Sequence, residues 1–429
     1  MPATYLTILT WTLRILCGGL FVFSGFVKAI DPWGTIFKFE EYLGALGFDV
    51  PFAIMVLGVF FLSALEFVVG LFLLTGCFRK SCPVVALVIM CVMLPLTLWI
   101  SIENPVSDCG CFGDAWHLSN WASFIKNVFL TAGILWLVFH NLQGICLITP
   151  AFQWLAVLSS GIFILVLELI GYYQQPLLDF RDYPVGSNLF AVEEEPNQHQ
   201  DYIFRYEKDG IVKDFTINDE IPDESDGWKF IERLESGGDI ADGVEEKGLQ
   251  VFYRDNMEDA NDEARLEKGE ELVILIPKVS MVSPATTWKL NELYDWAKAH
   301  DVKMVGIVSG SPEEIDNWED LSMASYPIFV ADDTSIKEAV RGNPGIIFLE
   351  DGKIKWKTNI SVFDVDAFTS DKNSDVVASI EGNNARYLLN IIFVYLAFMA
   401  FLVFISFTPR MARILTAGGL ASHRGVRHH

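Results

Sequence analysis

The amino-acid sequence predicts a polytopic α-helical membrane bundle that carries an α/β domain outside the membrane. Three observations support this fold class. The 429 residues are 52% hydrophobic and 20% charged, which is too apolar for an ordinary soluble chain of this length. Several apolar runs are long enough to span a bilayer. Residues 171–390, in contrast, hold 46 of the 55 acidic residues and 21 of the 31 basic ones, so this acidic part should repel nucleic acid.

The apolar runs come first in the chain. A bilayer core of about 30 Å takes roughly 20 helical residues to cross. We therefore expect six transmembrane helices, near residues 6–28, 53–76, 83–101, 121–140, 151–173 and 387–408. The first run has no basic start and no small-residue cleavage site after it, which favours a retained helix over a signal peptide.

Basic residues predict which connections face the cytoplasm. The loop around Arg79-Lys80 and the tail at 409–429 are basic, so both should be cytoplasmic. Alternation from these points places both termini in the cytoplasm, and the loops near 29–52 and 102–120 outside it. The acidic region at 174–385 is then periplasmic, and we expect a multi-pass protein of a bacterial inner membrane.

All seven cysteines lie in the first 150 residues, and only Cys109 and Cys111 fall at the predicted outer face. They are one residue apart, with glycines at 110 and 113 that permit tight turns. A Cys-Gly-Cys pair can close only a small, strained disulfide, which suits thiol/disulfide transfer better than a structural staple. The leading hypothesis is that Cys109 and Cys111 are catalytic thiols.

Other roles for the cysteines stay open. Asp108, Asp114 and His117 are close enough in sequence to join the two thiols in a metal site, although the spacing is a poor match to usual zinc sites. Both thiols could also be small structural residues in a compact turn. Within the predicted bilayer, Cys17 and Cys91 could form a second pair.

Ionisable residues within the predicted helices need partners, because a charge in the bilayer is costly. Arg14 and Glu66 lie at similar depths, roughly 12 and 15 Å from the inner ends of their helices. We therefore predict an Arg14–Glu66 ion pair, with a quinone-binding role as the alternative. Lys28, Lys126 and Glu168 lie near the outer ends, where they would snorkel to water or surround the Cys109–Cys111 loop. For Lys28 we expect snorkelling, whereas Lys126 is a candidate cation beside a reactive thiolate.

Several of these motifs resemble the DoxX/MauE-like membrane family. The loop phrase Asp-Cys-Gly-Cys-Phe-Gly-Asp is the most specific, and the match covers roughly residues 5–145. The other matching positions are Arg14, Gly18, Phe21, Ser24-Gly25, Lys28, Asp31-Pro32, Glu66, Gly70 and Gly76. The resemblance implies a four-helix membrane bundle over residues 1–145, and the apolar runs at 151–173 and 387–408 add a fifth and a sixth helix. MauE-type proteins are linked to disulfide formation in an exported enzyme subunit, and other members to oxidation with quinone, so a quinone is the implied electron acceptor.

The acidic region begins with a predicted β-hairpin and continues as an α/β unit. Residues 202–217 alternate apolar and polar side chains around Asp209-Gly210, a strong hairpin signal. Strands and helices then alternate, which indicates a sheet layered with helices. We expect strands at 272–276, 304–308 and 326–330, helices at 288–300, 312–321 and 334–340, and a hairpin at 346–356 with its turn at Asp351-Gly352.

This order resembles a thioredoxin-like domain of the TlpA type over about residues 245–370. The phrase from Val340 through Asn343-Pro344-Gly is similar to the family's cis-proline segment, so Pro344 is our cis candidate. The position of the family's Cys-x-x-Cys is held by Ser280 and Ser283, so this domain should lack oxidoreductase activity of its own. Ser283 before Pro284 is typical of a helix N-cap. The resemblance implies a groove at Pro344, Ser280 and Ser283 that binds a partner, and an inert spacer is the alternative.

The sequence therefore favours thiol/disulfide or quinone-linked electron transfer through Cys109 and Cys111, with an extracytoplasmic protein held by the outer domain. The alternative is a non-enzymatic scaffold or subunit of an envelope membrane complex. No internal helical repeat supports a transporter. The chain shows no phosphate-binding loop, hydrolase triad or haem motif.

Overall fold

The computed structural model describes most of the chain, and all structural statements below refer to these residues. They are 3–104, 110–116, 118–140, 146–190, 202–208, 211–216, 229–235, 248–266, 268–370, 376–377, 380 and 384–424. Cys109, Asp108, His117 and the Asp209-Gly210 turn lie outside the described residues.

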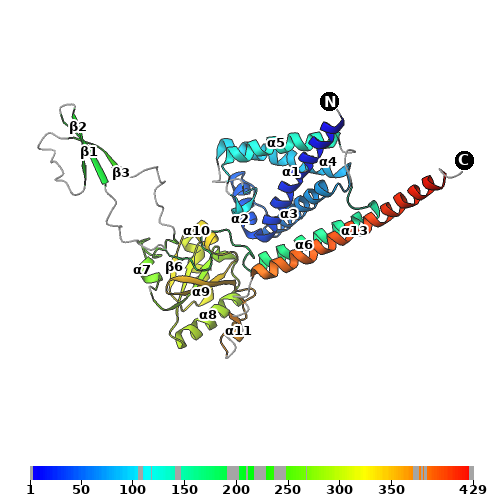
Figure 1. The fold of residues 1–429 in the computed structure, drawn as a ribbon. Coiled ribbons are helices and arrows are strands. Elements are labelled where there is room, and N and C mark those ends of the chain that lie inside the picture. The colour runs from blue at the N-terminus through cyan, green and yellow to red at the C-terminus, as the bar shows by residue number, and fades with distance from the viewer. Residues whose placement is uncertain are drawn as a thin grey trace.

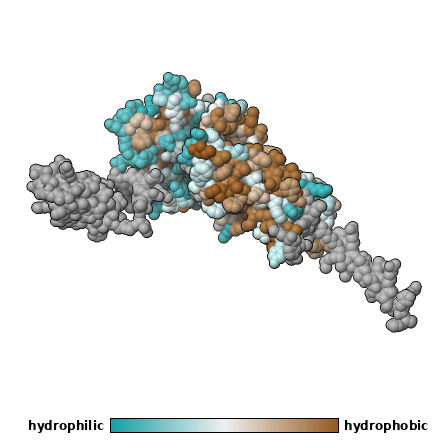
Figure 2. Space-filling model, turned by 90° about the horizontal axis from the view of Figure 1, so that it is seen from above, coloured by the Kyte–Doolittle hydropathy of each residue, from teal (hydrophilic) through white to brown (hydrophobic). Residues whose placement is uncertain are grey.

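Six helices are long and apolar enough to cross a membrane, as predicted, and the chain is a multi-pass membrane protein. They are α1 (Ala3–Ile30), α3 (Phe52–Thr75), α4 (Ser81–Glu103), α5 (Asn120–Phe139), α6 (Gln153–Tyr173, preceded by the 3₁₀ turn η2, Pro150–Phe152) and α13 (Asn384–Arg424). Figure 1 shows α1, α3, α4 and α5 together, with α6 and α13 running side by side next to them. Apolar residues cover the exposed helical surface in Figure 2, and hydrophilic residues gather on the domain beyond it.

Close packing of α1 against α3 sets the register of the bundle. A Cβ on Gly25 would lie 2.5 Å from the backbone nitrogen of Phe67, and one on Gly70 would lie 2.5 Å from that of Val22. Glycine at these positions lets the two helix backbones touch, as in other small-residue membrane interfaces. The α6–α13 pair is joined differently, by the Ser160 and Tyr395 hydroxyls 2.8 Å apart and by stacking of Phe163 on Tyr395.

The loop predicted near 29–52 contains a helix that was not predicted, α2 (Pro32–Ala45). Asp31 caps it by accepting a hydrogen bond from the Gly34 backbone, and Pro32 occupies its first turn. Trp33 anchors it to the end of α6, because its indole N–H donates to the Tyr172 carbonyl at 2.8 Å and its ring stacks on Tyr172. Residues 32–45 therefore form an amphipathic helix at the end of the bundle.

The region beyond α6 contains two sheets. The first has the order β2-β1-β3, built from β1 (Tyr202–Lys208), β2 (Ile211–Thr216) and β3 (Lys229–Glu235), all antiparallel. The predicted hairpin at 202–217 is its β1–β2 pair. Figure 1 shows this small sheet apart from the rest of the domain.

The second sheet has five strands in the order β6-β5-β4-β7-β8. Its strands are β4 (Glu270–Ile276), β5 (Lys303–Val308), β6 (Ile328–Val330), β7 (Gly345–Glu350) and β8 (Lys353–Asn359). β4, β5 and β6 are parallel, whereas β7 and β8 are antiparallel to their neighbours. The helical segments are α7 (Asn261–Ala264), η4 (Val279–Met281), α8 (Pro284–Ala299), α9 (Pro312–Ser322), α10 (Asp333–Ala339) and α11 (Val365–Phe368). Both faces of the sheet are buried in apolar clusters, which confirms an α/β unit.

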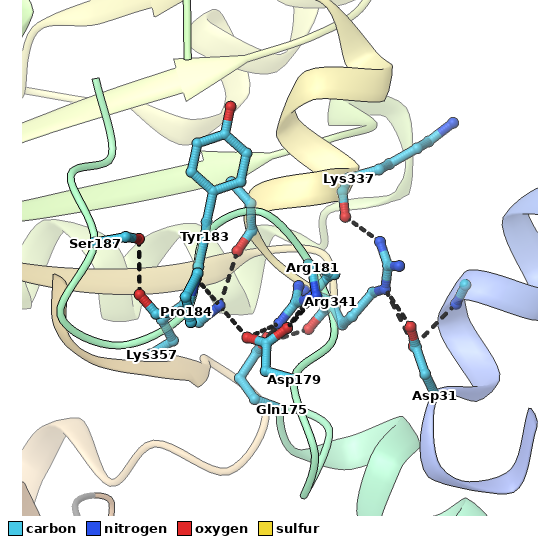
Figure 3. Close-up of polar contacts among 12 residues, drawn as sticks. Asp31, Gln175, Asp179, Arg181, Tyr183, Pro184, Ser187, Lys337, Arg341 and Lys357 are labelled. Atoms are coloured by element: carbon cyan, nitrogen blue, oxygen red, sulfur yellow. Dashed lines mark hydrogen bonds and ion pairs between the residues drawn. The ribbon is translucent and has the colours of Figure 1, made fainter. Parts of the chain in front are cut away.

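A buried polar cluster joins this α/β unit to the membrane helices (Figure 3). Arg341, just before β7, points its Nε at Asp31, 2.9 and 3.1 Å from the two carboxylate oxygens. Gln175, just after α6, donates to the Arg341 carbonyl at 2.6 Å, and Asn359 donates to the Tyr173 carbonyl at 3.2 Å. We call this group the junction cluster; its members are Asp31, Gln175, Asp179, Arg181, Arg341, Lys357 and Asn359.

The domain side of the junction cluster centres on Asp179. Arg181 lies 2.6 Å and Lys357 2.5 Å from its carboxylate. Burial disfavours the charged carboxylate, but these two cations outweigh that effect and lower the pKa of Asp179 to about 2. Burial, with the charges of Arg181 and Arg341, lowers the pKa of Lys357 to about 8. The cluster is thus a compensated set of buried charges and fixes the domain on the bundle.

Candidate functional site

A buried polar group lies directly beneath the Cys111 loop. The Ser24 hydroxyl is 2.7 Å from the Cys111 carbonyl oxygen and 2.8 Å from Glu66 Oε2, so its one proton is shared between two acceptors. Lys28 Nζ lies 2.8 and 2.7 Å from the two oxygens of Glu66 and donates to Ser24 Oγ at 3.1 Å. We call Ser24, Lys28 and Glu66 the Lys28 cluster.

The helix sequences explain why these three side chains meet. Ser24 and Lys28 are four residues apart on α1 and therefore share one face of that helix. Gly25 lies between them and brings the α3 backbone into contact, which sets Glu66 level with Ser24. The Lys28 and Glu66 side chains are only 4% and 5% exposed. Such a pair is stable in the membrane because each charge is matched and its hydrogen bonds are satisfied.

The Cys111 loop closes a small cavity above this cluster. The cavity has a volume of about 40 Å³, and Ser24, Lys28, Glu66, Cys111 and Lys126 are among its lining residues. The 3₁₀ turn η1 (Gly113–Ala115) follows Phe112, whose buried ring has its centre 5.3 Å from that of Phe23. Lys126 Nζ lies 4.1 Å from the centre of the Phe112 ring, a cation–π contact. Lys126, the predicted cation, therefore lies beside the loop, and Lys28 lines the same cavity.

The predicted Arg14–Glu66 ion pair is wrong. Arg14 Nε donates to the Leu73 carbonyl at 2.9 Å, and its guanidinium lies over the Trp11 ring, whereas Glu66 pairs with Lys28. The expectation that Lys28 snorkels is also wrong, since Lys28 is buried. Counting residues from the helix ends gave Arg14 and Glu66 similar depths, which does not predict which side chains meet. The register of α1 on α3 comes from the glycine contacts, which place Arg14 level with Leu73.

Glu168 is buried rather than exposed at the membrane surface. Its carboxylate accepts a hydrogen bond from Ser63, which lies one turn from Glu66 on α3. A line of buried polar side chains thus runs from the Cys111 loop across α3 to α6. Glu168 lines this interior and neither snorkels nor reaches the loop.

The metal alternative receives no support among the described residues, where no group of three or more His, Cys, Asp or Glu side chains could hold a metal ion. Asp108, Cys109 and His117 lie outside the described residues, as does the side chain of Asp114. Cys17 and Cys91 do not pair, because Cys17 is buried where α1 meets Gly133 of α5 and Cys91 is exposed on α4.

The structure brings the two predicted partner-binding segments together on one edge of the α/β unit. The Asn343–Pro344 peptide bond is cis, as predicted. Ser283 caps α8 by accepting from the Thr286 backbone, and Ser280 lies in η4. Asn343 holds the two segments by exchanging hydrogen bonds with the Lys278 backbone, with Nδ2 2.7 Å from the carbonyl oxygen.

This edge of the α/β unit faces α2 and the start of α3. Lys278 forms an exposed ion pair with Glu40 at 3.1 Å. A cleft of about 500 Å³ opens beside it, lined by Glu40, Phe48, Phe52, Lys278 and Met281 among others. A ligand in this cleft would touch both the membrane part and the segment next to Ser280.

Comparison with known proteins finds two family models in the chain. A domain of unknown function matches residues 200–236, which contain β1, β2 and β3. No curated protein and no solved structure matches the chain. Residues 6–140, which hold α1 to α5, the Lys28 cluster and the Cys111 loop, match the model of methylamine utilisation protein MauE.

Proposed function

We propose that this membrane protein takes part in thiol/disulfide exchange outside the cytoplasm, through Cys109 and Cys111. The observation that carries the proposal is the Lys28 cluster, whose Ser24 hydroxyl is 2.7 Å from the carbonyl oxygen of Cys111. A compensated ion pair at this depth has a cost in desolvation, and buried ionisable groups in membranes mark functional sites. The cluster fixes the loop that carries the thiols.

The residues at the loop support reactive thiols. Lys28 and Lys126 line the same cavity as Cys111. A cation near a thiol favours the thiolate, which is the nucleophile in exchange. Phe112 is buried and limits access of water to this side of the loop. The loop is therefore well placed to exchange with a substrate that approaches from its exposed side.

The exchange balances without a further reactant. A substrate thiolate attacks one sulfur of a Cys109–Cys111 disulfide and forms a mixed disulfide, releasing the other cysteine as a thiolate. The second substrate thiolate then displaces the first cysteine. The substrate gains a disulfide, the loop gains two thiols, and two electrons pass from substrate to loop. Relative reduction potentials set the direction.

A quinone does not fit the residues predicted to hold it. The cavity at Glu66 and Lys126 has a volume of about 40 Å³, and the one at Arg14 about 20 Å³. A cavity of about 150 Å³ is needed to hold a benzene ring. These cavities suit one or two water molecules. The exchange described above needs no quinone.

We further propose that the α/β unit is a thioredoxin-like domain that binds a partner without oxidising it. The strand order β5-β4-β7-β8, a cis-proline directly before β7, and Ser280 and Ser283 after β4 support this assignment. The cleft of about 500 Å³ beside Lys278 is the proposed place for an extended segment of the partner protein. A partner held there would lie between the domain and α2.

The alternative function is a non-enzymatic scaffold in an envelope membrane complex. Ser280 and Ser283 in the α/β unit favour it, because a domain with serines at these positions can bind a partner but cannot exchange disulfides. For both functions we propose the bacterial inner membrane, with both termini in the cytoplasm and the acidic region in the periplasm. The basic loop at Arg79-Lys80 and the basic tail support this orientation.

Thiol trapping in intact cells tests the proposal. Cys109→Ser and Cys111→Ser variants would be labelled with a mass-tagged maleimide before and after reduction, with the lipid-facing Cys91→Ser as the matched control. We expect a partly oxidised pair in the parent and the control, and mixed disulfides with a partner in the single-serine variants. Lys126→Met should slow labelling of Cys111, because it removes a cation that favours the reactive thiolate.

Two outcomes would count against redox exchange. One is a pair that stays wholly reduced or wholly oxidised when the cells are treated with dithiothreitol or diamide. The other is a Cys111→Ser variant that loses stability but forms no mixed disulfide. Either result would leave the scaffold as the better description.

A further inference from the structure

Three more thiols lie at the opposite end of the bundle, where α1 begins and the α3–α4 turn lies. Cys77 follows α3, Cys82 is in the first turn of α4, and Cys146 precedes η2. The side chains of Cys77 and Cys146 lie within hydrogen-bonding reach of each other. The segments that carry them are also tied, since the Leu147 backbone donates to the Thr75 carbonyl at 2.9 Å. Two cysteines 69 positions apart in sequence thus meet in space.

The two sulfurs of this pair differ in their surroundings. Cys77 is 1% exposed, whereas Cys146 is half-buried. Gln153 Nε2 donates to the Cys146 sulfur at 3.3 Å, and the Thr75 hydroxyl donates to the Cys77 sulfur at 3.3 Å. As a thiol, Cys146 donates to the Ile148 carbonyl at 2.9 Å. Cys146 is therefore the sulfur of this pair that another molecule can reach, and Gln153 donates to it.

Arg14 supplies a positive charge next to these thiols. It is buried, and its contacts in the described structure are the Leu73 carbonyl and the Trp11 ring, with no carboxylate among them. Arg14 lines one small cavity with Cys77, Cys82 and a second cation, Arg79. A buried cation without an acidic partner is costly in a membrane unless another negative group balances it. A thiolate is the available group.

We propose that Cys77 and Cys146 form a second thiol/disulfide exchange site, with Cys146 as the attacking thiolate, Cys77 as the resolving thiol and Arg14 as the counter-ion. The reactant is a soluble protein disulfide that reaches this end of the bundle. This inference does not depend on the exchange proposed for Cys109 and Cys111, because it rests on different residues.

The reaction runs in two balanced steps. The Cys146 thiolate attacks the protein disulfide, forming a mixed disulfide and releasing one partner thiolate. Cys77 then attacks Cys146, loses its proton and displaces the second partner sulfur. The products are a Cys77–Cys146 disulfide and a partner dithiol, which carries two electrons and both thiol protons. Burial raises the pKa of Cys77 to about 11, so Cys77 reacts only after Cys146 has captured the partner.

The test uses the full chain in lipid nanodiscs, in a Cys109→Ser/Cys111→Ser background that removes the outer pair. The protein is incubated in graded mixtures of reduced and oxidised dithiothreitol, alkylated and digested. We expect a peptide pair linked through Cys77 and Cys146 that appears with a single two-electron midpoint, while Cys82 remains alkylated. A purified oxidised thioredoxin should give the same linked peptides and be reduced in equal amount.

Arg14→Met should slow iodoacetamide labelling of Cys146 about tenfold at neutral pH, because the thiolate reacts and a nearby cation favours it. Arg14→Lys should keep most of the rate, and Cys17→Ser, on the same helix, is the matched control. Independent alkylation of Cys77 and Cys146 across the whole titration would overturn the proposal, as would linkage of either to Cys82. The alkylation titration needs no Arg14 variant, so it tests the proposal even where such a variant fails to fold.

Discussion

The Asp31–Arg341 pair gives the sharpest test of how the domain is held on the bundle. The two side chains are 9% and 4% exposed and the contact is 2.9 Å, so this is a buried ion pair. Removing one partner leaves a buried charge uncompensated, which costs about 3–5 kcal/mol. Arg341→Met should therefore lower the melting temperature of the domain by roughly 10 °C. Asp31→Asn should cost a similar amount, because asparagine retains the cap of α2.

The double variant Asp31→Asn/Arg341→Met separates pairing from other effects. It leaves no unpaired charge, so its cost should fall below the sum of the single costs by at least about 2 kcal/mol. Lys278→Met is the control at the same junction, since its pair with Glu40 is exposed and worth under about 1 kcal/mol. The assay is thermal unfolding of the full chain in nanodiscs, followed by tryptophan fluorescence. Additive single effects, or an Arg341→Met cost equal to that of Lys278→Met, would refute the reasoning.

Three further predictions concern other parts of the chain. Gly70→Ala should cost about 1–3 kcal/mol, because the new Cβ would lie 2.5 Å from the α1 backbone, whereas Gly58→Ala on the same helix meets no atom within 4 Å and should be neutral in the same unfolding assay. Burial raises the pKa of Glu271 to about 7 from 4.5, so its contribution to stability is full below pH 4.5 and is lost as pH rises through 7. Glu271→Gln should therefore raise the free energy of unfolding by about 3 kcal/mol at pH 8 in thermal unfolding. A difference that does not depend on pH would exclude this cause. The pKa of Asp179 is lowered to about 2 from 3.8, so the stability that its charge contributes is present above pH 3.8 and disappears towards pH 2. Asp179→Asn should therefore weaken the fall of stability between about pH 4 and pH 2. An unchanged fall would contradict the lowered pKa.

Local patterns were sufficient to predict most elements of the chain. Apolar runs predicted the six spans, since a bilayer imposes length and composition directly. Alternating apolar residues and Asp-Gly predicted the β7–β8 hairpin, and Ser283-Pro284 predicted the start of α8. These features depend on neighbouring residues, which a sequence shows. The helix α2 was missed because it is short, amphipathic and stabilised by Trp33 contacts with a distant segment.

The candidate site was predicted only in part. The loop with Cys111 and the cation Lys126 came from its motif, but the Lys28–Glu66 pair depends on which faces of α1 and α3 touch. Gly25 and Gly70 were the available signals for that register. The contact between Asp31 and Arg341 joins residues 310 positions apart and had no local signal. The contact between Cys77 and Cys146 likewise depends on how two turns meet.

The attachment of the α/β unit has a geometric consequence. A domain on one flexible linker would explore a volume that grows with the linker length, and a bound partner would sample many heights and orientations. Here the chain leaves α6 directly into Gln175 of the junction cluster, and α13 returns alongside α6. The domain therefore has almost no freedom to swivel. Whatever it holds is presented at one fixed distance and one fixed angle to the membrane, so partners are selected by shape and reach as well as by affinity.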